Sequence, residues 1–194
     1  MGTRHLICIY YNGRFVVAQY GQWDGNPEVQ GVKVLKFLRE PGNLERLKKG
    51  IEHIEEVKSD EEIRAFGSHE ALSRDTSAKV LEIIAEATPE TKVLIFKDLE
   101  FVNNTVLCEW AYVVDLDQEV FEVFEGYEGS RSKGERAQSN RFQDVGPLEA
   151  EVPILVSSFS FDSLADLPSD GDFVEKVDLR RKVLGLKYDS DECE

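Results

Sequence analysis

The chain has 194 residues, 41% of them apolar, and a formal net charge of −15 at pH 7. This length and composition are typical of a globular protein that buries its own core, and no apolar run approaches the ~20 residues of a bilayer-spanning helix. The negative charge argues against nucleic acid and anionic membranes as partners, because both need clustered cations. Cys8, Cys108 and Cys193 form no CxxC motif, which favours free thiols in a reducing compartment, the cytoplasm.

The first element expected in the chain is a β-hairpin. Residues 5–11 (H-L-I-C-I-Y-Y) and 14–19 (R-F-V-V-A-Q) are rich in β-formers and flank Asn12-Gly13. Asn-Gly tolerates the positive φ angles of a type I′ turn, so the pattern predicts two antiparallel strands. Both faces of these strands are apolar, which is typical of strands covered on both sides, and we expect the hairpin in the middle of a sheet.

The middle of the chain predicts helices, from apolar residues at helical spacing and from capping signals. The expected segments are a helix from Gly31 to Leu38, one from Asn43 through Ile54, a short one from the Ser59/Glu62 capping box to Phe66, and one capped at Asp75 or Thr76 that ends before Pro89.

Strands return in the second half. We expect a short strand over 92–96, a hairpin of 106–115 and 120–125, a strand over 154–161, and a helix from Ser169 with Phe173, Val174 and Val177 inward. Residues 126–144 are polar and predict a mobile surface loop, and 189–194 predict an acidic tail.

The fold class is therefore α/β (α+β), with one domain over 1–188. Its hairpins form one or two sheets covered by helices, and a four-layer αββα sandwich is one such arrangement.

The loop over residues 20–27 (Y-G-Q-W-D-G-N-P) is the first candidate site. Its glycines permit sharp turns or a close approach to a ligand. Tyr20, Gln22 and Trp23 are residue types that line small-molecule pockets. A structural loop, in which Trp23 covers the end of the sheet and Asp24 caps a turn, is the alternative.

Charged residues near this loop extend the candidate site. Counted outward from the hairpin turn, Arg4 falls opposite about Gly21, within reach of Asp24. Such a pair either holds a substrate or locks the loop. Glu109 interrupts an apolar strand and is either a binding residue or an outward-facing one. No nucleotide-binding motif occurs and no two histidines have metal-ligand spacing, so we expect neither cofactor nor metal.

Three stretches carry a resemblance: the start M-G-T-R-H-L-I, the loop Y-G-Q-W-D-G-x-P, and the hairpin E-W-A-Y-V-V-D-L-D…F-E-V-F. They resemble a family of uncharacterised proteins found in fungi, bacteria and phages. The order of strand, Asn-Gly turn, strand and helices is also similar to the start of N-terminal-nucleophile hydrolases. That likeness implies Thr3 as nucleophile, although removal of Met1 would expose Gly2 instead of Thr3.

Two functions follow as hypotheses. The first is an interaction or regulatory protein without catalysis, motivated by the lack of a complete catalytic motif and by the acidity. The second is an amide-bond hydrolase in which Thr3, Arg4 and Asp24 are catalytic and Tyr20, Gln22, Trp23 and Glu109 bind the substrate. The partner is a protein or a small molecule of unknown identity.

Overall fold

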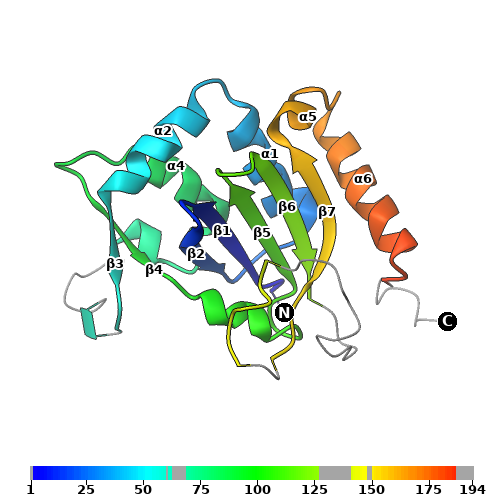
Figure 1. Cartoon of the computed structure of the whole chain (residues 1–194), viewed down its shortest axis with the longest axis horizontal. Helices are drawn as coiled ribbons and strands as arrows, with labels where there is room; N and C mark the ends of the chain where they lie inside the picture. The colour runs from blue at the N-terminus through cyan, green and yellow to red at the C-terminus, as the bar shows by residue number, and fades with distance from the viewer. Residues whose placement is uncertain (1, 60, 63–68, 127–140, 148–149, 187–194) are drawn as a thin grey trace.

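The computed structural model describes residues 2–59, 61–62, 69–126, 141–147 and 150–186. A five-stranded sheet lies at its centre, in the order β2-β1-β5-β6-β7 (Figure 1). The strands are β1 (His5–Tyr11), β2 (Arg14–Gly21), β5 (Trp110–Asp115), β6 (Val120–Glu125) and β7 (Ile154–Ser160). Strands β1 and β5 pair in parallel and the other neighbours pair antiparallel, so the sheet is mixed. The predicted α/β class and both predicted hairpins are confirmed.

Helices cover one face of this sheet. They are α1 (Val32–Arg39), α2 (Asn43–Gly50), α4 (Val80–Ala85) and α6 (Asp170–Val183), with the short α5 (Phe161–Ala165) after β7. Side chains alternate along a strand, so Ile7 and Ile9 of β1 enter the core beneath the helices. Leu6 and Cys8 enter a second core on the other face, together with Phe142. A 3-10 helix, Leu99–Asn103, also contributes to that second core.

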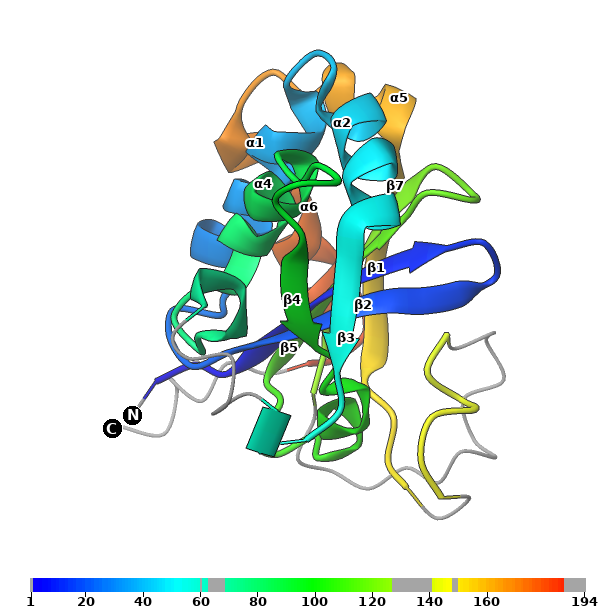
Figure 2. The same ribbon diagram turned by 90° about the vertical axis from the view of Figure 1, so that its left-hand side faces the viewer.

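A second sheet contains only β3 (Ile54–Val57) and β4 (Val93–Phe96), which pair in parallel. It lies on the β2 side of the large sheet, as Figures 1 and 2 show from two directions. The Asp98 amide just after β4 donates a hydrogen bond to the Ala18 carbonyl of β2. The described residues therefore have no pair of sheets stacked between helix layers, and the αββα sandwich is not the arrangement of this protein.

The first hairpin differs from its prediction in position and register. Both of its faces are covered, as expected, but β2 is an edge strand, because β1 lies between β2 and β5. The register shifts by one residue between Ile9 and Tyr10, where β2 contains a bulge. As a result His5, and not Arg4, is opposite Gly21.

The helix expected from Asn43 through Ile54 ends early, at Gly50. A Cβ on Gly50 would lie 1.7 Å from the Ile84 carbonyl oxygen, so this position serves the close approach of α2 to α4. The chain then continues as β3. Asn43 does not cap α2 through its side chain; its amide group donates to the Phe37 carbonyl.

Only part of the segment 126–144 is described, and that part corrects the prediction of a mobile surface loop. Phe142 is fully buried, stacks on Phe15 and meets the edge of Phe124. Arg141 bonds to two buried carboxylates. Residues 127–140 and the predicted tail 189–194 lie outside the described residues.

Candidate functional site

The start of β1, the loop after β2 and the stretch before α4 meet in one region, here called the N-terminal corner (residues 2–5, 20–26 and 73–78). Main-chain hydrogen bonds assemble it: the Gly25 amide donates to the Thr3 carbonyl at 2.9 Å, and the Gln22 amide donates to the Arg74 carbonyl at 3.1 Å. The Tyr112 hydroxyl donates to the Gly25 carbonyl at 2.7 Å. These bonds fix the loop directly against β1.

His5 is the centre of this corner and has no exposed surface. A Cβ on Gly21 would lie 2.2 Å from His5 Nε2, and a Cβ on Gly25 would lie 2.7 Å from Nδ1. The two glycines of the loop therefore leave the space that the imidazole fills. Burial lowers the pKa of His5 to about 4, so the ring is neutral at pH 7. Nε2 is buried and has no hydrogen-bond partner.

Two residues with positive φ angles lie near His5, and one of them, Ser77, is of a type that rarely adopts such an angle. Asp24 has a φ of 54° and Ser77 a φ of 49°, in the left-handed region that disfavours residues other than glycine, asparagine and aspartate. The other two such residues in the described part of the chain, Asn12 and Glu119, belong to hairpin turns, where positive φ is ordinary. Strain outside turns is concentrated at functional sites, which makes the corner a candidate.

The residues predicted from the sequence fall into two groups. Arg4, Tyr20 and Glu109 lie toward the second core: the Arg4 amide donates to Glu109 Oε1 at 3.1 Å, and the Tyr20 ring meets the edge of Phe101. The Tyr20 hydroxyl donates to Gln22 Oε1 at 2.6 Å. Glu109 therefore has a local structural contact with the first strand.

Trp23, Asp24 and Thr3 lie with His5. Trp23 is 48% exposed and its indole N–H donates to Asp75 Oδ1 at 3.1 Å. Thr3 contributes its main-chain carbonyl to the corner, and its role as a nucleophile stays a prediction. Among the described residues no ion pair joins Arg4 to Asp24, so the pairing expected from the register is wrong. The bulge in the hairpin is the reason, because it moves the register by one residue.

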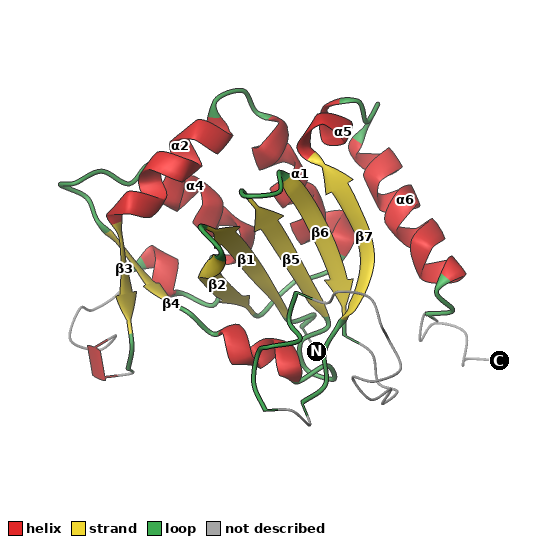
Figure 3. Cartoon of the chain, viewed as in Figure 1, coloured by secondary structure: helices red, strands yellow, loops and turns green. Residues whose placement is uncertain are grey.

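A second candidate region is the groove between β7 and α6, which run side by side (Figure 3). It has a volume of about 460 Å³ and lies along β7 residues 155–159, with Lys176, Leu179 and Arg180 of α6 opposite. Among the described residues, no carboxylate lines it. Arg181 holds α6 against the sheet through two 2.7 Å bonds to Glu125 of β6, so the groove has a rigid base.

The outer side of α6 carries two exposed apolar residues among charged ones. Phe173 and Val177 are buried, while Leu179 is 60% and Val183 68% exposed, and Leu184 follows them at the end of the helix. A second hollow of about 540 Å³ lies across Leu179 from the first. Exposed apolar side chains beside two hollows make this side of the helix a candidate contact surface.

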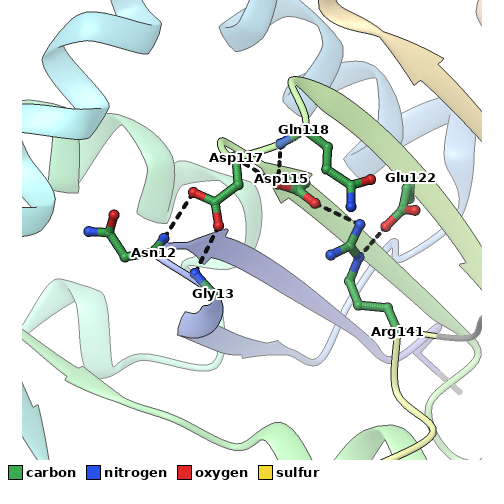
Figure 4. Close-up of polar contacts among 7 residues, drawn as sticks. All are labelled: Asn12, Gly13, Asp115, Asp117, Gln118, Glu122 and Arg141. Carbon is green, nitrogen blue, oxygen red and sulfur yellow. Dashed lines mark hydrogen bonds and ion pairs between the residues drawn. The ribbon is translucent and has the colours of Figure 1, made fainter.

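A third polar cluster, at the opposite end of the sheet from the corner, is structural (Figure 4). Both oxygens of Asp117 accept main-chain N–H groups of the β1–β2 turn at 2.9 Å. Asp115 accepts the amides of its own turn and pairs with Arg141 at 2.7 Å. Arg141 also bonds to Glu122. Each of these carboxylates bonds to main-chain amides or to Arg141. No group of three metal-ligating side chains occurs in the described part of the chain.

Comparisons of the chain with protein-family models, with curated proteins and with solved structures returned no match. The functional role of the two candidate regions is therefore inferred from their geometry and chemistry alone. Within the described ranges, no helix is both long and apolar enough to cross a membrane.

Sequence reasoning missed His5, Ser77 and the cations of the groove. His5 reads as the polar start of a strand, and Ser77 reads as part of a helix cap. A signal was present for α6: the apolar residues at 179 and 183 do not share the inward face of 173 and 177.

Proposed function

We propose that the protein is an interaction protein that binds an extended acidic segment of a partner protein by strand addition along β7. The observation that carries this proposal is the groove itself. Lys176 and Arg180 stand beside an edge strand, I-L-V-S-S-F-S, that contains neither a charged residue nor a proline. Edge strands of natural proteins are commonly guarded by such residues, and an unguarded edge is a template for another strand.

Charge selects the partner. The chain carries a net charge of −15, yet the described residues that line the groove include two cations and no anion. Carboxylates of an extended segment would pair with these cations while its main chain bonds to β7. Exposed Leu179 offers an apolar contact to an aliphatic side chain of the bound strand, and the neighbours of that side chain along the strand point to the opposite face. The expected ligand therefore alternates acidic and aliphatic residues.

Buried free thiols agree with the predicted location in a reducing compartment. Cys8 and Cys108 are both buried and unbridged, and burial raises the pKa of each thiol. Both are therefore unreactive components of the second core. These unbridged thiols support our proposal of a cytoplasmic location.

The test is a fluorescence-anisotropy titration of the full chain with a seven-residue peptide of alternating glutamate and leucine. We expect saturable binding, and none for a peptide with lysine in place of glutamate. Arg180→Glu should weaken binding about tenfold or more, since it replaces an attraction by a repulsion. Lys182→Glu is the matched control, because it makes the same charge change on the same helix beside the other hollow. Equal weakening by both variants would overturn the proposal.

Strand addition has its own test. Alternate N–H groups of a strand point to the same neighbour, so N-methylation of alternate peptide bonds should abolish binding in one set and spare the other. Equal binding of the two methylated peptides would contradict main-chain pairing with β7. Binding that occurs only after residues 187–194 are removed would assign the groove to the chain's own acidic end instead of a partner.

A further inference from the structure

The turn between β1 and β2 carries an asparagine amide next to a glycine, and neither candidate region uses it. Asn12-Gly13 is the single Asn-Gly pair of the sequence. Both residues are exposed, so water reaches the side-chain amide of Asn12, which points away from Asp117 in Figure 4. An asparagine side-chain amide is an electrophile, and the main-chain nitrogen of the next residue can attack it to close a five-membered ring. Glycine allows that approach best, because it has no Cβ in the way.

The nitrogen that would attack is held by a carboxylate. The Gly13 amide donates to Asp117 Oδ2 at 2.9 Å, and the Asn12 amide donates to Oδ1 at 2.9 Å. A main-chain nitrogen attacks only after it has lost its proton, and the negative charge of Asp117 disfavours the anion that would form beside it. A hydrogen bond to a charged acceptor is also stronger than one to a neutral acceptor, so the proton stays on the Gly13 nitrogen. Asp117 therefore protects the Asn12 side chain from attack by its own neighbour.

Asp117 reaches this turn from a second hairpin, and that hairpin fixes its position. Asp117 lies in the β5–β6 turn, where Asp115 Oδ1 accepts the Asp117 and Gln118 amides at 2.8 Å each. The Leu116 amide donates to the Tyr10 carbonyl at 2.9 Å, at the end of the parallel pairing of β1 with β5. The two turns are therefore bonded to each other, and only their separation frees the glycine amide of the first turn.

We infer that Asn12 is a site of spontaneous deamidation, which Asp117 suppresses while the two turns are joined. When the turns separate, the Gly13 amide gives its proton to hydroxide and its nitrogen attacks Asn12 Cγ. The bond from Cγ to the side-chain nitrogen breaks, ammonia leaves with a proton from water, and a succinimide remains. Water then hydrolyses one of the two C–N bonds of the ring: cleavage at Cγ yields aspartate, and cleavage at the main-chain carbonyl yields isoaspartate. The net reaction consumes one water and releases one ammonia, with no oxidation or reduction.

Formation of isoaspartate would keep the two turns apart. Isoaspartate adds one carbon to the main chain at position 12, whereas a two-residue type I′ turn matches the twist of its strands only with the normal main chain. The amides of residues 12 and 13 could then no longer both face Asp117. Each product also carries a new negative charge near that of Asp117, and like charges disfavour the joined arrangement. The modification therefore acts in one direction, from joined to separated turns.

The test is incubation of the full chain in mildly alkaline buffer, followed by peptide mass spectrometry that detects the replaced amide at Asn12 and distinguishes aspartate from isoaspartate. Asp117→Ala should convert about tenfold or more faster than the parent, since its Gly13 amide loses a hydrogen bond to a charged group. Hydrogen exchange of the Gly13 amide requires loss of the same proton, so it should quicken by a similar factor. In urea, where neither chain is folded, the two proteins should convert at the same rate.

Glu125→Gln is the control for stability. It breaks an ion pair with α6 at the far end of β6 from the turn, so it should destabilise the fold and still convert at the rate of the parent. Equal rates for the folded parent and folded Asp117→Ala would overturn the inference, and so would a parent that converts as fast when folded as in urea. Equal acceleration by Glu125→Gln and Asp117→Ala would also overturn it, because the protection would then come from the stability of the whole fold.

Discussion

Burial of His5 should make the stability of the protein depend on pH in a defined direction. The pKa of His5 falls from 6.5 to about 4 because the ring is desolvated, with Lys33 lowering it further and Asp24 opposing. Between these values the unfolded chain binds a proton that the folded chain does not. Stability is therefore complete above pH 6.5 and is lost as the pH falls toward 4. At about 1.4 kcal/mol for each pH unit, the loss is about 2 kcal/mol at pH 5 and about 3 kcal/mol at pH 4.

Urea unfolding of the parent and of His5→Gln at pH 7.5 and pH 5 measures this effect. Glutamine is neutral at both pH values, and carboxylates elsewhere titrate equally in the two proteins. The parent should lose about 2 kcal/mol more than the variant between the two conditions. The same pH dependence in both proteins would refute the buried, neutral state of His5.

Three further predictions concern contacts of charged side chains. Glu125→Gln leaves the buried Arg181 guanidinium without its main counter-charge and should cost about 3 kcal/mol of unfolding free energy, measured with urea. The double variant Glu125→Leu with Arg181→Met should recover most of that loss. Asp117→Ala removes two hydrogen bonds to the β1–β2 turn and should cost about 1–2 kcal/mol. Arg4→Gln and Asp24→Asn should show no coupling in a double-mutant cycle, because no ion pair joins them.

Each of these has a contrary outcome. If the losses of unfolding free energy from the single substitutions at Glu125 and Arg181 simply add in the double variant, the two side chains do not stabilise each other. An Asp117→Asn variant as damaging as the alanine variant would mean that the negative charge, not the acceptor geometry, stabilises the turn. A coupling above about 0.5 kcal/mol between Arg4 and Asp24 would restore the lock expected from the sequence.

Local signals predicted much of the fold. Asn12-Gly13 specified the first turn, the Ser169 hydroxyl caps α6 by accepting the Asp172 amide, and the strand over 92–96 is β4. These features depend on residues within a few positions of each other, so they are readable along the chain.

Non-local features were not readable. The parallel pairing of β1 with β5 joins residues about a hundred positions apart. Gly50 allows α2 to approach α4 closely, a fact of packing that its place in the sequence does not show. The bulge beside Ile9 shifted the register and placed His5, not Arg4, in the corner.

The predicted site residues stay predictions, and the structure adds His5 and Ser77 as their neighbours. The loop over 20–27 borders Ser77, which has a positive φ, and the unsatisfied Nε2 of His5. Its glycines, read as sites of ligand approach, instead admit the ring of His5. Ser77 reaches the same ring from a segment more than fifty residues further along, so no spacing in the sequence joins them.

Hydrogen exchange of the full chain with and without the acidic peptide tests the central claim most directly, because it reports which main-chain amides the ligand covers. The account predicts slower exchange in β7 and along the outer side of α6, no change at residues 20–26, and loss of the effect in Arg180→Glu. Protection that appears elsewhere while β7 exchanges as it does in the free protein would contradict it.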